Sequence, residues 1–89
     1  MNDLNHPKIN KIKSEIFEIQ KALFDAESKY PDHCVDIVHA VAIMSEEAGE
    51  SVQAANDVKW SNGSIDHLKN ELRQTAAACI RVLINMESI

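Results

Sequence analysis

Apolar residues recur at alternating spacings of three and four near the start of the chain, at Ile9, Ile12, Ile16, Ile19 and Leu23. Residues at these spacings share one face of a helix, so the pattern predicts a helix from about Pro7 to Lys29. Pro7 suits the first turn of that helix, where a missing backbone N–H costs nothing. The helix is expected to end near Lys29, because Tyr30 precedes a proline and such residues avoid helical angles.

A second helix is predicted from about Cys34 to Lys59, with Asp32 placed to cap its first turn. Its first half, Val35 to Met44, is apolar on almost every side, which predicts a central and buried helix. Its second half, Ser45 to Asp57, carries carboxylates on one face and apolar residues on another. The two halves therefore predict different roles, packing for the first and chemistry for the second.

The clearest turn in the chain is Ser61-Asn62-Gly63-Ser64. It leads into a last helix predicted from about Ile65 to Met86. Ser64 suits the N-cap of this helix, and the carboxylate of Asp66 suits the positive end of the helix dipole. The apolar stripe of this helix is formed by Leu68, Leu72, Ala76, Cys79, Ile80 and Leu83.

Three helices joined by short connections predict an all-α fold, an antiparallel helical bundle in a single domain that spans residues 1–89. Aromatic residues make up only 4% of the chain, which favours packed helices over a sandwich or barrel. A chain of 89 residues is only marginally stable alone. Neither a disulfide nor a zinc site is evident, so assembly into a homodimer or homotetramer is expected to complete the bundle.

The chain is acidic, with a net charge of −5 and no basic stripe, which argues against nucleic-acid binding. A phosphorylated ligand remains compatible with this charge if a divalent metal supplies the positive charge. The sequence opens on no signal peptide, and no run approaches the roughly 20 apolar residues of a membrane span. Cys34 and Cys79 are isolated and are expected to be reduced packing residues, as is typical of a cytoplasmic protein.

Glutamates are concentrated at Glu46, Glu47 and Glu50, and a further one, Glu71, follows the turn. Residues three or four apart face the same way on a helix, so the first three carboxylates repel one another. A hard divalent cation with oxygen ligands, such as magnesium, offsets this repulsion. Spacing alone leaves open a solvated acidic face, since glutamate is a good helix former. Gly49 favours the metal site, because a glycine within a helix costs roughly 1 kcal/mol against alanine and indicates close approach of a backbone or ligand.

The segments Glu46-Glu47-Ala48-Gly49-Glu50 and Glu71-Leu72-Arg73-Gln74 resemble the EExxE…ExxD signature of the MazG-like, all-α nucleotide pyrophosphohydrolases. The flanking sequences Val38–Ile43, Val52–Ala55 and Gln74–Ala78 are also similar, and the resemblance covers about Pro31 to Leu83. It implies antiparallel helices that assemble as dimers or tetramers. It also implies magnesium-dependent cleavage, with manganese as a possible substitute, between the α- and β-phosphates of a nucleoside triphosphate.

Carried over by position, the resemblance implies that Glu47, Glu50 and Glu71 are metal ligands and that Glu46 activates the attacking water or holds an outer-shell water. Gln74 stands where the family motif has aspartate. An amide oxygen can coordinate magnesium but brings no negative charge. Two alternatives therefore stay open beside the enzyme: a nucleotide- and metal-binding protein with little catalysis, and a structural helical oligomer with a solvated acidic face.

Four further residues are candidates for substrate binding. His39 lies eleven positions before Glu50, on roughly the same face, although a buried core histidine is the alternative. Trp60 could stack on a base beside Lys59, or it could anchor the turn. Arg81 lies two turns beyond Gln74 and could meet phosphate, or it could form a surface ion pair.

Overall fold

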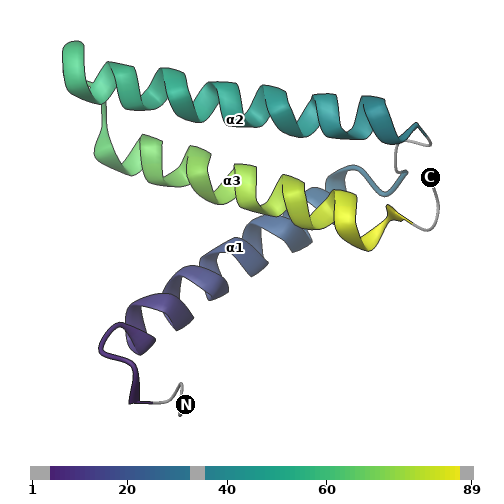
Figure 1. Cartoon of the computed structure of the whole chain (residues 1–89), viewed down its shortest axis with the longest axis horizontal. Coiled ribbons are helices and arrows are strands. Elements are labelled where there is room, and N and C mark those ends of the chain that lie inside the picture. Colours follow the sequence, from purple (N-terminus) through teal and green to yellow (C-terminus); the bar gives the residue numbers. More distant parts are fainter. Residues whose placement is uncertain (1–4, 33–35, 87–89) are drawn as a thin grey trace.

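The computed structural model describes residues 5–32 and 36–86, and these form three helices. Helix α1 spans Ile9–Lys29, α2 spans Ile37–Trp60 and α3 spans Ile65–Ile84. The described residues contain no strand, so the predicted all-α class is confirmed. Helices α2 and α3 run side by side in opposite directions, whereas α1 crosses near one end of α3 and points away from the pair (Figure 1).

The ends of α1 lie close to their predicted positions. The helix ends at Lys29, as expected, and the N–H of Tyr30 donates to the carbonyl of Ala26 at 2.9 Å. At the other end Pro7 lies before the helix rather than in its first turn. A tight turn causes this difference, because the N–H of Ile9 donates to the carbonyl of His6 at 3.0 Å.

The N-cap of α2 is Asp36 and not the predicted Asp32. The Oδ1 atom of Asp36 accepts from the backbone N–H groups of Val38 and His39, at 2.9 and 3.3 Å. These bonds satisfy donors that a helix start leaves without partners, so the helix begins at Ile37. The predicted start at Cys34 lies outside the described residues.

The turn between α2 and α3 lies where the sequence predicted it, at Ser61–Ser64. Asn62 adopts a left-handed φ of 57°, and the N–H of Gly63 donates to the carbonyl of Asp57 at 2.8 Å. A Cβ at Gly63 would lie 2.7 Å from the carbonyl carbon of Asp57, so only glycine fits. Ser64 caps α3 by accepting from the N–H of His67 at 3.1 Å, as predicted. The helix ends at Ile84, slightly before the predicted Met86.

The core is thin and lies where α2 meets α3. Among the described residues, the buried apolar side chains are Ala40, Ala54, Ala77 and Val82, and Ser51 is the buried polar one. Small residues at this contact allow the two helix backbones to approach closely. Helix α1 buries none of its residues. It is held to α3 by Arg73, whose guanidinium makes two 2.8 Å bonds to the carboxylate of Glu15.

The prediction that the first half of α2 is central and buried is wrong for the single chain. Val38, Val41 and Ile43 are exposed, at 74%, 40% and 45%. The reason is that α1 packs on α3 and makes little contact with α2, so α3 is the central helix and α2 has one neighbour. Within the described residues, no helix combines the length and apolar character needed to cross a membrane.

Candidate metal centre

The structure brings together three of the glutamates that the sequence singles out. Glu47 and Glu50 extend from α2 and Glu71 extends from α3, and one carboxylate oxygen from each lies within 4.8 Å of the others. Glu47 and Glu50 share a face because they are three residues apart on a helix. Glu71 reaches them because the Ser61–Ser64 turn returns α3 along α2.

Two hydroxyl groups fix the register of α2 against α3 beside this cluster. The Oγ of Ser51 and the Oγ1 of Thr75 lie 2.9 Å apart and share a hydrogen bond. The Thr75 hydroxyl also lies 3.0 Å from the carbonyl of Glu71, one turn earlier on its helix. Each hydroxyl residue follows a cluster glutamate by four positions, so the contact holds the two helices together where Glu47 and Glu71 emerge.

Glu71 carries the clearest sign that the cluster is incomplete. Its side chain is only 14% exposed, and its Oε2 atom is buried with no hydrogen-bond partner among the described residues. The other oxygen, Oε1, lies 3.9 Å from the Nε2 of His67. Buried carboxylate oxygens are costly unless paired, and most find a donor. This one has none among the described residues, and it belongs to a side chain that converges with two further carboxylates.

The electrostatics of Glu47 agree with that interpretation. The pKa of the Glu47 carboxyl is raised above its ordinary value, first because burial disfavours the charged form. Repulsion from the carboxylates of Glu50, Glu71 and Glu46 raises this pKa further. The residues that shift this pKa include no positively charged side chain that would offset the repulsion. An all-oxygen set of two partly buried glutamates and one exposed glutamate fits a hard divalent cation.

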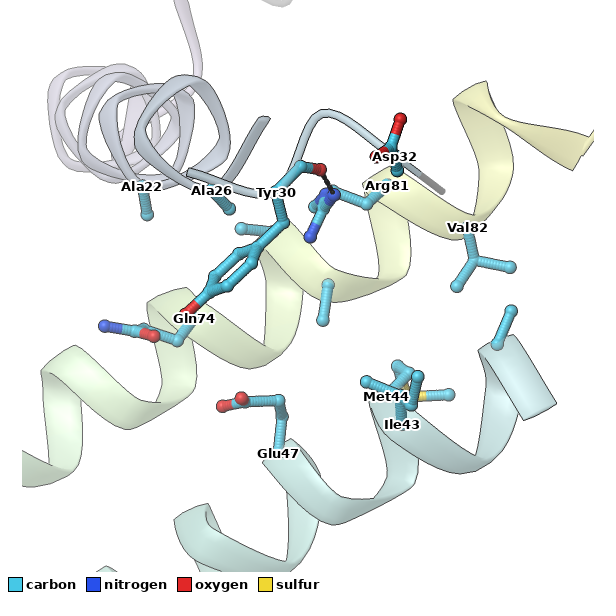
Figure 2. A pocket seen from close by; sticks show the side chains of 13 residues that line it. Ala22, Ala26, Tyr30, Asp32, Ile43, Met44, Glu47, Gln74, Arg81 and Val82 are labelled. Carbon is cyan, nitrogen blue, oxygen red and sulfur yellow. Dashed lines mark hydrogen bonds between the residues drawn. The ribbon is translucent and has the colours of Figure 1, made fainter. Parts of the chain in front are cut away.

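Glu46 and Gln74 lie at the edge of the cluster. Glu46 is exposed and is not one of the three converging carboxylates, although its charge acts on Glu47. Gln74 is three residues after Glu71 on α3 and is also exposed. Its side chain and that of Glu47 line the same cleft from opposite helices (Figure 2). The structure thus places both predicted residues beside Glu47, and Glu46 is not one of the three converging carboxylates.

The cleft beside the cluster has a volume of about 440 Å³ and lies between the C-terminal half of α1, the first half of α2, and α3. Alanine side chains from all three helices form much of its wall. Tyr30 and Asp32, from the connection after α1, close one side of it (Figure 2). Sequence reasoning missed these two residues, because no motif marks them and only the docking of α1 brings them to the cleft.

Arg81 lines this cleft but is already engaged. Its Nε donates to the Oε1 of Glu27 at 2.9 Å, and a terminal nitrogen donates to the carbonyl of Tyr30 at 2.6 Å. The ion pair that the sequence left as an alternative for Arg81 is therefore present. The side chain is 18% exposed, so this pair joins α1 to α3 in a partly buried position.

The other three predicted substrate residues lie away from the cluster within one chain. His39 is exposed and does not line the cleft, so the alternative of a buried core histidine is wrong for the single chain. Trp60 is 73% exposed, and the Nζ of Lys59 lies 4.7 Å from the centroid of its ring. Trp60 follows Glu50 by ten positions, about 15 Å along the helix.

Gly49 is not approached closely by another part of the described chain. A Cβ built on it would meet nothing within 4 Å, so neither another helix nor the turn approaches it closely in this chain. The glycine faces open space on the side of α2 away from α3. Close approach of another backbone is thus wrong for the single chain, and close approach of a ligand stays a prediction.

Comparison of the chain with protein-family models, with curated proteins and with solved structures gave no match. The assignment to a function therefore depends on the geometry of the cluster and on the motif that its residues form.

Proposed function

We propose that this chain is a magnesium-dependent nucleoside triphosphate pyrophosphohydrolase that converts ribo- or deoxynucleoside triphosphates to monophosphates and pyrophosphate. The observation that supports it best is the convergence of Glu47, Glu50 and Glu71 within 4.8 Å, with the buried Oε2 of Glu71 lacking a partner in the described part of the chain. The same three residues match the metal-ligand positions of the MazG-like motif, and that match depends on the sequence alone.

The chemistry assigned to each side chain follows from its position. A magnesium ion, when bound, supplies the positive charge that neutralises phosphate oxygens and acidifies a water molecule. Glu47, Glu50 and Glu71 would hold it, and Gln74 is placed to add an amide oxygen. Glu46, exposed beside them, takes the proton of the attacking water as general base. The water oxygen adds to the α- or β-phosphorus, the bond between that phosphorus and the oxygen that bridges the two phosphates breaks, and the products are the nucleoside monophosphate and pyrophosphate.

The neighbouring cleft is a suitable place for the rest of the substrate. Its volume of about 440 Å³ falls within the range of small-molecule sites, and Glu47 lies at its edge. Arg81 forms part of its wall and is the predicted substrate residue that the fold brings to it. The proposal includes assembly as a homodimer or homotetramer, in which His39, Lys59 and Trp60 stay predictions for substrate contact.

One observation favours a second function, a nucleotide- and metal-binding protein with little turnover. Gln74 brings no charge to the position where the motif has aspartate. The structural oligomer with a solvated acidic face is less favoured, because the side chain of Glu71 is only 14% exposed and its buried oxygen has no hydrogen-bond partner among the described residues.

The test is pyrophosphate release from a panel of ribo- and deoxynucleoside triphosphates, with magnesium and with EDTA. Magnesium-dependent release that is lost in Glu50→Gln and kept in Glu18→Gln supports the enzyme. Glu18 is a suitable control because it pairs with Lys21 on α1, away from the cluster. Glu46→Gln should lower turnover while the magnesium-dependent rise in melting temperature remains.

Absence of release from every nucleotide, together with a magnesium-dependent rise in melting temperature, would favour the binding protein. Absence of both effects would favour the structural oligomer and contradict the metal centre. Gln74→Asp separates the first two cases further. It restores the motif carboxylate and is expected to tighten magnesium binding, with pyrophosphate release rising if the glutamine limits catalysis.

A further inference from the structure

The cleft beside the cluster runs away from the three carboxylates along both helices of the hairpin. Its wall on α2 extends from Ala40 to Glu47, and its wall on α3 extends from Gln74 to Val82. Because α2 and α3 run in opposite directions, Glu47 and Gln74 lie at the same end of the cleft, which is the end beside the cluster (Figures 1 and 2). The positions from Gln74 to Val82 span about 12 Å of helix. This length is enough for a sugar and a base placed end to end.

Beyond that end the wall is mostly apolar. It consists largely of alanines from all three helices, together with Ile43, Met44 and Val82. Small side chains leave room between the helices, and an apolar wall offers nothing to compensate the charge of a phosphate. The wall therefore suits the uncharged part of a nucleotide, and the cluster at its end suits the phosphates.

An aromatic ring extends over this apolar part of the cleft. Tyr30 is 63% exposed, and among the described residues that line the cleft it is the aromatic one. Its ring reaches from the connection after α1 toward the space between α3 and α2, and Ile43 and Met44 line the cleft from α2 (Figure 2). A flat ring with an open face is favourably covered by a second flat ring. A base that enters between Tyr30 and α2 is covered on both of its faces.

The backbone of Tyr30 is fixed before any ligand binds. Its N–H donates to the carbonyl of Ala26 at 2.9 Å, and its carbonyl accepts from Arg81 at 2.6 Å. Pro31 follows and restricts the backbone angles of Tyr30 further. Arg81 is itself held by the carboxylate of Glu27, at 2.9 Å. An aromatic side chain on a fixed backbone loses little freedom when it binds a ligand, which favours affinity.

We propose that the base of the bound nucleotide stacks on the ring of Tyr30 while its phosphates lie at the cluster of Glu47, Glu50 and Glu71. This inference rests on the proposed function for the identity of the ligand. Every base has a π-face, so stacking on Tyr30 holds purines and pyrimidines alike. Tyr30 thus distinguishes a nucleotide from a phosphate compound that has no base.

Trp60, which the sequence suggested for stacking on a base, lies in the opposite direction within one chain. It follows Glu47 by about 20 Å along α2, at the end of the helix next to the turn. The cleft instead extends from Glu47 toward the start of α2, at Ala40. A nucleotide in the cleft therefore points its base away from Trp60 of the same chain and toward Tyr30.

The test measures the Kd of α,β-methylene nucleoside triphosphates for the full chain with magnesium, by isothermal titration calorimetry. Carbon replaces the bridging oxygen in these analogues, so they bind without being cleaved at that position. Methylenediphosphonate is the matched ligand, because it carries the same P–C–P group and no base. Tyr30→Leu should weaken the binding of purine and pyrimidine analogues about tenfold and leave the Kd of methylenediphosphonate unchanged. Tyr30→Phe should bind both ligands as wild type does, because it keeps the ring.

Two control variants remove aromatic rings that do not line the cleft. Phe24→Leu makes the same change at a ring on α1 that is 62% exposed, and Trp60→Leu removes the other candidate for stacking. Both should keep the wild-type Kd for the analogues. A loss of affinity in Trp60→Leu with none in Tyr30→Leu would overturn the assignment. An equal loss for methylenediphosphonate in Tyr30→Leu would also overturn it, because the effect would then not involve the base.

The base site and the proposed function can fail separately in this experiment. If wild type binds methylenediphosphonate as tightly as the analogues, the base site is wrong and the metal centre remains. If Tyr30→Leu weakens the analogues but wild type releases no pyrophosphate from any natural triphosphate, the base site stands and the enzyme does not. Absence of binding of both ligands to wild type would overturn both.

Discussion

The two flanks of the α2–α3 hairpin are both incomplete in the single chain, but each lacks something different. One flank gathers Glu47, Glu50 and Glu71 and leaves a buried oxygen of Glu71 without a partner in the described structure. The other flank exposes Val52 and Leu72 to solvent. The first lacks positive charge at a single point, whereas the second lacks apolar cover over a broad area.

These two needs call for partners of different size. A local excess of negative charge is met by a small cation, because its effect is concentrated within a few ångströms. Exposed apolar surface is met only by another large surface, because the gain on burial grows with the area removed from water. The flanks should therefore respond independently to substitution as long as the α2–α3 contact between them is intact.

The largest effect is expected on the charged flank. At a magnesium concentration a hundredfold above Kd, binding adds about 2.7 kcal/mol to the free energy of unfolding. Glu71→Gln should lose this gain, because one of the three converging carboxylates becomes neutral. In EDTA the same variant should melt at a higher temperature than wild type, because less negative charge is held in a partly buried cluster. Thermal unfolding followed by circular dichroism, with magnesium and with EDTA, measures both shifts.

Glu18→Gln is the control for this substitution, since it removes a glutamate from α1 that is paired with Lys21. It should keep the full magnesium shift. The mass of the assembly should be the same in both variants. A Glu71→Gln chain that still gains the wild-type stability from magnesium would show that the cluster does not bind the ion.

A somewhat smaller effect on stability is expected from a substitution at the contact between α2 and α3. This substitution should affect both flanks. Ala54 is 2% exposed where α2 meets α3, so Ala54→Leu must push the helices apart. Overpacking of this kind costs about 2 kcal/mol in the free energy of unfolding. The variant should lose part of the magnesium shift and also dissociate part of the proposed assembly, and thermal unfolding and light scattering would record the two losses.

Ala42→Leu is the matched control, because Ala42 is exposed on the same helix and faces away from α3. It adds the same side chain without separating the helices. If Ala54→Leu were to weaken only one of the two properties, the flanks would not share the α2–α3 contact as their common support.

The sequence predicted the helices well, because their signals are local. The alternating spacing in α1, the proline after Tyr30, the turn at Gly63 and the cap at Ser64 act through neighbouring residues. The start of α2 was misplaced because Asp32 and Asp36 both suit an N-cap, and only the structure shows that Asp36 accepts the bonds. Burial was predicted least well. Periodicity shows that Val41 shares a face with other apolar residues, but not whether a neighbour covers that face.

In the candidate site, too, only the arrangement of residues within one helix was predictable from the sequence. Spacing places Glu47 and Glu50 on one face, and the turn makes a meeting with Glu71 feasible. The register that brings Glu71 to them depends on the contact between Ser51 and Thr75, which no sequence pattern specifies. The role of Arg81 depends on where α1 docks, since its partner Glu27 lies far away in the sequence. Contacts between side chains of different helices therefore could not be predicted from the sequence and are known only from the structure.

The smallest effect is expected at the link between α1 and α3, which belongs to neither flank. Arg73 donates two hydrogen bonds to Glu15, and they hold the pKa of the Glu15 carboxyl below its ordinary value. A lowered pKa means that the folded chain favours the charged carboxylate. The pair therefore stabilises the fold at neutral pH, and this contribution is lost as the pH falls past the ordinary glutamate value of about 4.3 and through the lowered value.

Glu15→Gln should accordingly melt slightly below wild type at neutral pH, and the difference should disappear in acid. The effect is small because both partners are partly exposed and water screens their attraction. Asp25→Asn is the control, since Asp25 pairs with Lys29 inside α1 and joins no helices. Both variants should keep the magnesium shift and the mass of the assembly. If Glu15→Gln alters either property, α1 supports a flank of the hairpin, and the two flanks are not independent of it.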